Sequence, residues 1–271
     1  MKGVRADVRL VELGLCESRE KARAVIMSGN AYLGETRVDK PGDNVPEGCR
    51  LELRGAENPF VSRGGLKLEK AIEKYGIGLS GAIAADVGAS TGGFTDCMLR
   101  HGAAKVYAID VGYGQLDWKL RSDARVVVME RTNARFMEPA WFAQALDFAS
   151  MDVSFISIRL ILPGIRACLR EGAKSVVLVK PQFEAGKGKV GKNGVVRDPA
   201  LHREVLVGAA RFAAETGFAL EGMDYSPITG PKGNIEFLLI LKKSEDGEGI
   251  AGESIEAEAA RVVREAHEAH A

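Results

Sequence analysis

The stretch from Ile83 to Asp96, which reads I-A-A-D-V-G-A-S-T-G-G-F-T-D, decides the fold. It begins as a short apolar run, which is typical of a buried parallel strand, and then breaks at Gly88, Gly92 and Gly93. Glycine permits positive φ angles and lets a ligand approach the backbone closely. Apolar residues at helical spacing follow. The stretch therefore predicts a strand, a glycine-rich turn and a helix, which together build a nucleotide-type pocket in a doubly wound sheet.

The composition of this turn favours a cationic ligand over a phosphate. The turn matches neither G-x-G-x-x-G nor G-x-x-x-x-G-K-[ST], and it contains no lysine. Asp86 ends the strand instead, and a carboxylate suits a ligand with a positive charge and hydroxyl groups. S-adenosylmethionine, which has an ammonium, a sulfonium and a ribose, fits this description. The alternative is a tight strand-to-helix turn that binds nothing. The residues expected around the ligand are Asp86, Gly88, Ala89, Ser90, Thr91, Gly92, Gly93 and Phe94.

The composition of the chain sets bounds on its class. With 271 residues, 46% of them hydrophobic and 27% charged, the chain suits one large and one small globular domain. The net charge is zero, so nucleic-acid binding would depend on local basic patches. The four cysteines form no C-x-x-C pair and the histidines show no ligand spacing, so we expect reduced thiols and no metal. The sequence shows no signal peptide or membrane span, which favours a cytoplasmic protein.

Strands and helices continue to alternate after the glycine-rich turn. Asp110 ends the second predicted strand, 24 residues beyond Asp86, where a carboxylate usually holds ribose hydroxyls. Asp152 ends the fourth strand. We therefore predict an α/β domain over residues 64–243, built on a doubly wound, seven-stranded, Rossmann-like sheet with the ligand at its carboxyl edge. The strands predicted after the first lie at residues 105–110, 125–130, 147–152, 175–180, 218–225 and 235–241.

Residues 1–55 are predicted to form a separate small α+β unit. Ser18 is a plausible N-cap for a helix that ends at Gly29, and short strands with turn residues follow. Basic side chains gather in and around this unit, although acids accompany them and a solvated face is the alternative. The polar segment 56–63 is expected to be a linker. The candidate RNA contacts here are Arg5, Arg9, Arg19, Lys21, Arg23, Arg37, Lys40 and Arg63.

Four charged residues are expected at one rim of the sheet. Lys67 lies on the preceding helix, Asp152 and Lys180 follow the fourth and fifth strands, and Glu236 lies near the start of the last strand. Any one of them alone could be an exposed salt-bridge partner, but all four together indicate a catalytic site. A neutral lysine can accept a proton from a hydroxyl, and a second lysine lowers its pKa while carboxylates raise it. The sequence leaves the net direction open.

These motifs carry a resemblance to a known family. S-R-E-K-A-R-A-V-I-M-S-G-N and V-D-K-P-G-D resemble the S4 RNA-binding domain, and D-V-G-A-S-T-G-G-F-T-D, M-D-V-S-F-I-S, L-V-K-P-Q-F-E and G-N-I-E-F-L resemble the FtsJ-type 2′-O-ribose methyltransferases. Over residues 5–241 the chain resembles the TlyA family, named both for haemolysin and for ribosomal RNA cytidine-2′-O-methylation. The K-D-K-E tetrad of that family matches Lys67, Asp152, Lys180 and Glu236.

The resemblance implies S-adenosylmethionine as methyl donor and ribosomal RNA, within the ribosomal subunits, as substrate. Asp86 or Asp152 would meet the donor's ammonium, Asp110 its ribose and Asn133 its adenine. Lys180 would act as general base or would orient the target 2′-hydroxyl, while Lys67 and Glu236 set its proton state.

Three other interpretations compete with an RNA methyltransferase. Residues 186–192 spell G-x-G-x-x-G and G-x-x-x-x-G-K, but Asn193 replaces the Ser or Thr of a P-loop. We expect instead a mobile basic loop that closes over RNA through Lys187, Lys189 and Lys192. A membrane-active haemolysin would need an amphipathic segment, and residues 244–271 are predicted to be a frayed acidic tail rich in Ala and Glu. A non-catalytic RNA-binding or ribosome-assembly factor is the third alternative.

Overall fold

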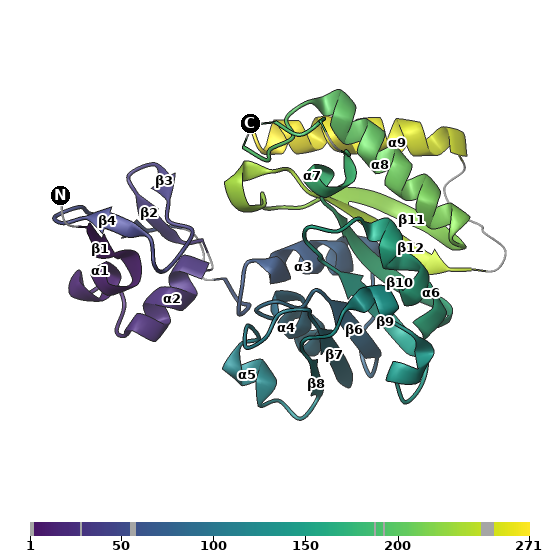
Figure 1. Ribbon diagram of the computed structural model, residues 1–271, viewed down its shortest axis with the longest axis horizontal. Coiled ribbons are helices and arrows are strands. Elements are labelled where there is room, and N and C mark those ends of the chain that lie inside the picture. The colour runs from purple at the N-terminus through teal and green to yellow at the C-terminus, as the bar shows by residue number, and fades with distance from the viewer. Residues whose placement is uncertain (1–2, 28, 55–57, 187, 192, 245–251) are drawn as a thin grey trace. The chain divides into compact units, whose positions relative to one another are not determined.

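The computed structural model describes residues 3–27, 29–54, 58–186, 188–191, 193–244 and 252–271. The chain divides into two compact units, Met1–Gly64 and Gly65–Ala271, which are considered separately (Figure 1).

The N-terminal unit packs two helices beside two small sheets. Helices α1 (Ala6–Glu12) and α2 (Arg19–Met27) accompany a three-stranded sheet with the order β3 (Thr36–Arg37), β2 (Ala31–Leu33), β5 (Leu51–Leu53). Strand β1 (Gly3–Arg5) pairs antiparallel with β4 (Asn44–Pro46), and these two strands were not predicted. The Ser18 hydroxyl accepts a hydrogen bond from the Lys21 amide, as expected of an N-cap. The core comprises Ala6, Leu10, Cys16, Ala22, Ile26, Ala31, Val38, Val45 and Leu51.

A buried carboxylate organises the basic residues of this unit. Asp7 is fully buried, and its two oxygens accept hydrogen bonds from Arg5 and Arg19 at 2.9–3.0 Å. The hydrogen bond from Arg5, aided by that from Arg19 and opposed by burial, lowers the pKa of Asp7 to about 2. Asp7 therefore fixes one end of each arginine while about half of each arginine side chain stays exposed.

The C-terminal unit is built on a seven-stranded sheet, as predicted. Its order is β11-β12-β10-β9-β6-β7-β8, and every neighbouring pair is parallel except the two pairs that include β12. The strands are β6 (Ile83–Val87), β7 (Lys105–Ile109), β8 (Val126–Met129), β9 (Leu146–Met151), β10 (Leu169–Val179), β11 (Phe218–Tyr225) and β12 (Phe237–Lys243).

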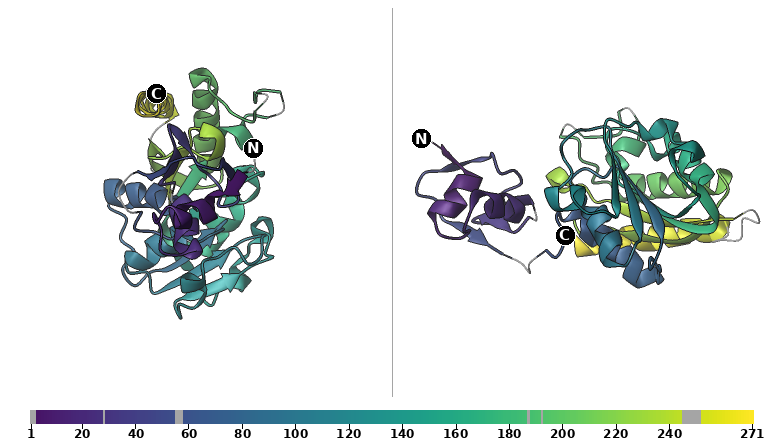
Figure 2. Two further views of the ribbon diagram at one scale, coloured as in Figure 1. Left: turned by 90° about the vertical axis from the view of Figure 1, so that its left-hand side faces the viewer. Right: turned by 90° about the horizontal axis from the view of Figure 1, so that it is seen from below.

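Helices lie on both faces of this sheet, as the two views of Figure 2 show. They bury the central strands so completely that Ala84, Ala85 and Val87 of β6 are almost inaccessible, which explains the uninterrupted apolar run there. The helices are α3 (Gly64–Tyr75), α4 (Gly93–Arg100), α5 (Trp118–Arg121), α6 (Leu162–Cys168), α7 (Pro181–Glu184), α8 (Pro199–Glu215) and α9 (Gly252–Ala269).

The prediction of a frayed C-terminal tail over residues 244–271 is wrong for the part that the structure describes. Helix α9 packs against α8 and β11 (Figure 1). A narrow stripe of buried residues, spaced by three and four positions, joins it to the core. Two members of the stripe are alanines, whose burial a search for large apolar residues overlooks. The stripe comprises Ile255, Ala259, Val262, Val263 and Ala266.

The chain reverses direction in the middle of the sheet. From β6 it proceeds outward through β7 and β8, and then returns to place β9 on the other side of β6. The loops that leave the carboxyl ends of β6 and β9 consequently run in opposite directions and open a crevice. Ligands of doubly wound proteins bind at such a switch point.

The packing of α9 predicts that its core side chains stabilise the C-terminal unit. We expect Val262→Ala to lower the free energy of unfolding by about 2 kcal/mol, because it leaves a cavity in the stripe. The exposed Glu268 of the same helix provides a matched control, and Glu268→Ala should change stability by less than about 0.5 kcal/mol. Chemical denaturation measures both variants. Equal, negligible effects would mean that the helix does not pack in solution.

The N-terminal unit should depend on the ionised form of Asp7. Since the native pKa lies below the ordinary 3.8, this group stabilises the fold above about pH 4 and ceases to do so as the pH falls towards 2. Asp7→Asn should cost about 1 kcal/mol at neutral pH after solvent screening and should flatten this acid dependence. Hydrogen exchange of α1 and α2 measures the unit by itself. Asp39→Asn, in an exposed pair with Arg37, is the control and should have little effect.

Candidate active site

A cavity of about 380 Å³ occupies the switch point of the sheet. The ends of three neighbouring strands supply its wall: Gly88 and Ser90 follow β6, Asp110 follows β7, and Asp152 follows β9. Apolar and polar side chains from the adjoining loops complete it. These are Ile109, Val111, Gly112, Gln115, Thr132, Asn133, Ala134, Val153, Ser154, Phe155, Ile156 and Ile161.

The predicted donor-binding residues divide into two groups. Gly88, Ser90, Asp110, Asn133 and Asp152 line the cavity. The remaining six lie outside its lining, and most of them are buried where β6 meets α4. They are Asp86, Ala89, Thr91, Gly92, Gly93 and Phe94.

The two left-handed glycines of the turn have different tasks. At Gly88 (φ 86°) an added Cβ would lie 2.4 Å from the carbonyl oxygen of Asp152, so glycine is required for the loops after β6 and β9 to approach each other. At Gly92 (φ 95°) an added Cβ would lie 2.2 Å from Leu120. The absence of a side chain at Gly92 thus leaves room for Leu120 of α5.

Asp86 anchors the turn from inside the protein. Its carboxylate is fully buried and accepts hydrogen bonds from the hydroxyls of Thr95 (2.7 Å) and Ser150 (3.4 Å). Burial raises its pKa to about 7, although these hydrogen bonds oppose the shift. Asp86 and Asp152 were the two acids predicted to meet the donor's ammonium, and of these only Asp152 lines the cavity.

Two backbone amides hold the carboxylate of Asp110 in place. One oxygen accepts a hydrogen bond from the amide of Ser90 (2.8 Å) and the other from the amide of Gly112 (2.6 Å). Ser90 itself has a left-handed backbone (φ 48°), an unfavourable conformation that persists where the surroundings enforce it. A carboxylate fixed in this way is suited to accept hydrogen bonds from vicinal hydroxyls.

The four charged residues predicted at the rim come together. The ammonium of Lys67 lies 2.6 Å from Glu236 and 3.2 Å from Asp152. Asp152 also pairs with the ammonium of Lys180 at 2.5 Å. We refer to Lys67, Asp152, Lys180 and Glu236 as the tetrad. Asp152 belongs both to the tetrad and to the wall of the cavity, so the two features form one site.

Burial makes the charges of the tetrad depend on one another. Lys67 and Glu236 are almost inaccessible, and an unpaired charge there would be strongly unfavourable. Burial acts to lower the pKa of Lys67, but the two neighbouring carboxylates outweigh it and the pKa is raised. Burial likewise acts to raise the pKa of Asp152, while Lys67 and Lys180 hold it below its ordinary value. Two ammoniums, those of Lys67 and Lys180, therefore flank a carboxylate that stays charged.

Two residues that the sequence did not suggest lie beside the tetrad. The hydroxyl of Ser154 accepts a hydrogen bond from Lys180 (3.0 Å). Phe155 lines the cavity with 91% of its surface exposed and a left-handed backbone (φ 64°), and its ring contacts that of Phe183. A large, exposed apolar residue in a strained conformation indicates a functional surface. The positive φ that reveals it is invisible in the sequence.

The predicted RNA contacts of the N-terminal unit are largely paired with acids. Arg9 pairs with Glu12, Lys21 with Glu17, and Arg37 with Asp39, in addition to the pairs that Arg5 and Arg19 form with Asp7. Arg23 and Lys40 are exposed, and Arg63 is half-buried.

The basic loop predicted after α7 is only partly described. Lys187 and Lys192 lie outside the described residues, while Lys189 pairs with Glu204.

One group of possible metal ligands lies on the helices of the C-terminal unit. The side chains of Glu69, Cys97 and His101 approach within 4.8 Å of one another. They already satisfy one another, because Glu69 accepts hydrogen bonds from Cys97 (3.3 Å) and pairs with His101 (2.7 Å). They are separate from the tetrad. Within the described residues, no helix has the length and apolar character needed to cross a membrane.

Comparison with known proteins agrees with both units. The model of the FtsJ-like methyltransferase family matches residues 60–243, and that of the S4 domain matches residues 4–50. YqxC of Bacillus subtilis is 53% identical over 268 residues, covering 98% of this chain and 95% of that protein. The 16S/23S rRNA (cytidine-2′-O)-methyltransferase TlyA of Mycobacterium tuberculosis is 44% identical over 243 residues, covering 89% and 91%.

A solved structure is similar to this chain over nearly its whole length. This Streptococcus thermophilus protein, which bears the name hemolysin, covers 99% of this chain and 97% of its own, with 46% identity and a TM-score of 0.79. Both family models and relatives along nearly the whole length therefore agree with the fold described above. The chain belongs to the TlyA family, in which an S4 domain precedes an FtsJ-like methyltransferase domain.

Proposed function

We propose that this protein transfers a methyl group from S-adenosylmethionine to the 2′-hydroxyl of a cytidine in ribosomal RNA, and that it acts in the cytoplasm where ribosomes are found. The observation that carries the proposal is the contact between the tetrad and the cavity through Asp152. The M. tuberculosis and Campylobacter jejuni relatives are both named rRNA (cytidine-2′-O)-methyltransferases, which supports the choice of nucleoside.

The cavity has the chemistry that S-adenosylmethionine requires. Asp110 offers acceptors for ribose hydroxyls, Asp152 a negative charge for the ammonium, and Asn133 with neighbouring apolar groups a surface for the adenine. The close approach of Gly88 to the backbone at Asp152 leaves no side chain between these groups. When bound, S-adenosylmethionine supplies an activated methyl group on its sulfonium.

Lys180 is the member of the tetrad that we assign to the 2′-hydroxyl. A charged ammonium has three donors; Ser154 accepts from one of them, and Asp152 lies within ion-pair distance. A remaining donor can hold the hydroxyl oxygen, which fixes its position for attack. Alternatively, after it has lost its own proton, Lys180 accepts the proton of the hydroxyl. Lys67, which stays charged between Asp152 and Glu236, keeps both carboxylates in place and needs no direct contact with the RNA.

Phe155 provides a surface for a base. Its exposed ring projects beside the same cavity, and aromatic side chains stack on unpaired bases of RNA. We expect the target nucleoside, once unstacked, to lie against this ring while its ribose reaches Lys180.

Removal of the Lys180 amine should abolish most of the reaction. We expect Lys180→Ala to lower the rate of methyl transfer by at least about 100-fold. The assay uses labelled S-adenosylmethionine with separated ribosomal subunits and naked ribosomal RNA, followed by analysis of the labelled nucleoside. Lys180→Arg distinguishes the two roles, since arginine can orient a hydroxyl but cannot accept its proton. Lys242→Ala is the control, because Lys242 lies at the other end of β12 from Glu236.

If the protein binds the donor but no RNA becomes labelled, the result would contradict the proposed methyltransferase activity. It would favour the alternative of a non-catalytic ribosome-assembly factor. Label on a base instead of a ribose would contradict the role of the 2′-hydroxyl.

Loss of the Asp110 charge should weaken donor binding. Asp110→Asn removes an ionised acceptor from the cavity, and hydrogen bonds to charged groups are worth roughly 10- to 100-fold in affinity. Isothermal titration calorimetry with S-adenosylmethionine measures the change. Asp117→Asn is the control, because Asp117 caps α5 outside the lining of the cavity. Equal affinities of wild type and Asp110→Asn would remove Asp110 from the donor site.

A further inference from the structure

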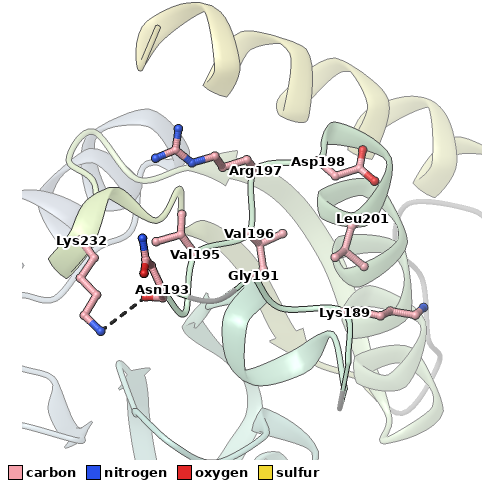
Figure 3. Close-up of a pocket in the computed structure, with 9 residues that line it drawn as sticks. All are labelled: Lys189, Gly191, Asn193, Val195, Val196, Arg197, Asp198, Leu201 and Lys232. Carbon is pink, nitrogen blue, oxygen red and sulfur yellow. Dashed lines mark hydrogen bonds between the residues drawn. The ribbon is translucent and has the colours of Figure 1, made fainter.

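A second, larger cavity of about 820 Å³ lies in the C-terminal unit, apart from the donor cavity (Figure 3). The segment between α7 and α8 forms most of its wall, and the turn before β12 completes it. Its lining residues include three cations, Lys189, Arg197 and Lys232, and one acid, Asp198. The carboxylate of Asp198 accepts a hydrogen bond from the amide of Ala200 at the start of α8, so it serves as a helix cap. We call this feature the basic cavity.

The cations are distributed around the basic cavity and do not converge on one point. Lys232 and Lys189 lie at opposite ends of it, and Arg197 lies between them in the view of Figure 3. Within the part of the chain that the structure describes, Arg197 and Lys232 form no ion pair, whereas Lys189 pairs with Glu204. Since the net charge of the chain is zero, a local excess of this kind marks a surface for a polyanion.

Lys232 is held in an unfavourable backbone conformation. Its φ angle of 68° is left-handed, a region that side chains other than those of Gly, Asn and Asp rarely adopt. Its ammonium donates a hydrogen bond to the carbonyl oxygen of Asn193 across the cavity (3.4 Å). The turn thus presents a lysine where a glycine or asparagine would be less strained, which points to a use for its charge.

A buried asparagine joins the two walls of the basic cavity. Asn234 accepts a hydrogen bond from the amide of Val196 (3.1 Å) and donates one to the carbonyl oxygen of Gly194 (3.0 Å). The backbone carbonyl oxygen of Asn234 accepts a hydrogen bond from the amide of Gly230 (2.8 Å). Only 3% of Asn234 is exposed, so water competes little for these bonds. Buried hydrogen bonds of Asn234 therefore connect the two walls of the basic cavity.

The same elements hold the tetrad. Glu236 follows Asn234 by two residues, and an added Cβ at Gly230 would lie 2.3 Å from its carboxylate. At the other end, α7 follows Lys180 directly and leads into the wall of the cavity. Lys232 thus precedes Glu236 by four residues, and the lining of the other wall begins at Lys189, nine residues after Lys180.

We propose that the basic cavity binds successive phosphates of the RNA strand that flanks the target nucleotide. The inference rests on the proposed function, because it takes RNA as the substrate. Separate cations around the basic cavity suit phosphates joined in a chain, each neutralised by one side chain. A free nucleotide, whose phosphates are adjacent, suits a converging site with backbone donors. Contacts to phosphates position RNA without reading its sequence, so the cavity aligns the strand while the tetrad acts on one ribose.

The test compares single neutral substitutions in the full-length protein. Lys232→Gln and Arg197→Gln each remove one cation from the cavity, and Lys242→Gln removes one from the far end of β12 as a matched control. Affinity for a fragment of ribosomal RNA is measured over a series of salt concentrations. We expect each cavity variant to weaken binding by roughly 3- to 10-fold at low salt and to reduce the salt slope by about 1, while Lys242→Gln changes neither.

Three further measurements make the result decisive. Affinity for S-adenosylmethionine and the thermal midpoint should equal those of the wild type, because the exposed cations lie outside the donor cavity. Inorganic phosphate and ADP at millimolar concentration should not compete with RNA, and competition by either would favour a free nucleotide. Cavity variants with the RNA affinity and salt slope of the wild type would overturn the proposal.

Failure of the methyl transfer reaction is a separate outcome. RNA that binds in a salt-dependent manner through Lys232 and Arg197, but is never methylated, would contradict the proposed enzyme and leave the phosphate sites in place.

Discussion

The buried ion network of the tetrad is the interaction on which the rest of the C-terminal unit depends. Lys67, near the start of the unit, meets Glu236, just before the last strand of its sheet, at 2.6 Å, and it also meets Asp152, in the middle of the chain, at 3.2 Å. Because an unpaired charge would be costly in this environment, each buried member depends on its oppositely charged partner. The doubly wound sheet makes that possible by bringing distant strand ends to one edge.

Much of this arrangement could be predicted from the sequence. Apolar runs predicted the seven strands, which the structure confirms, and the acids that end the second and fourth placed Asp110 and Asp152 at the same edge. The same reasoning missed features that tertiary packing creates. Strand β4 contains Asn44 and Pro46 and has no alternating pattern, and α9 buries alanines as its contact surface.

The glycine-rich turn shows why the predicted site was broader than the cavity. Its residues are close in sequence but differ in what they contact: Gly88 and Ser90 line the cavity, whereas Asp86 and Gly92 contact side chains outside its lining. The same glycines and acids appear in a sequence whether they serve ligand binding or packing within the fold. Only the three-dimensional structure distinguishes the two uses. Likewise, Ser154 and Phe155 gain their positions from the loop conformation after β9, which no periodicity predicts.

Asp152 belongs both to the wall of the donor cavity and to the tetrad, and this has a thermodynamic consequence. A ligand that neutralises its charge from the side of the cavity changes the free energy of the two ammoniums on the other side. Such coupling is reciprocal: each ligand changes the binding free energy of the other by the same amount. On the proposed function, the donor and acceptor sites are therefore not independent, because a single carboxylate couples the occupancy of one to the affinity of the other.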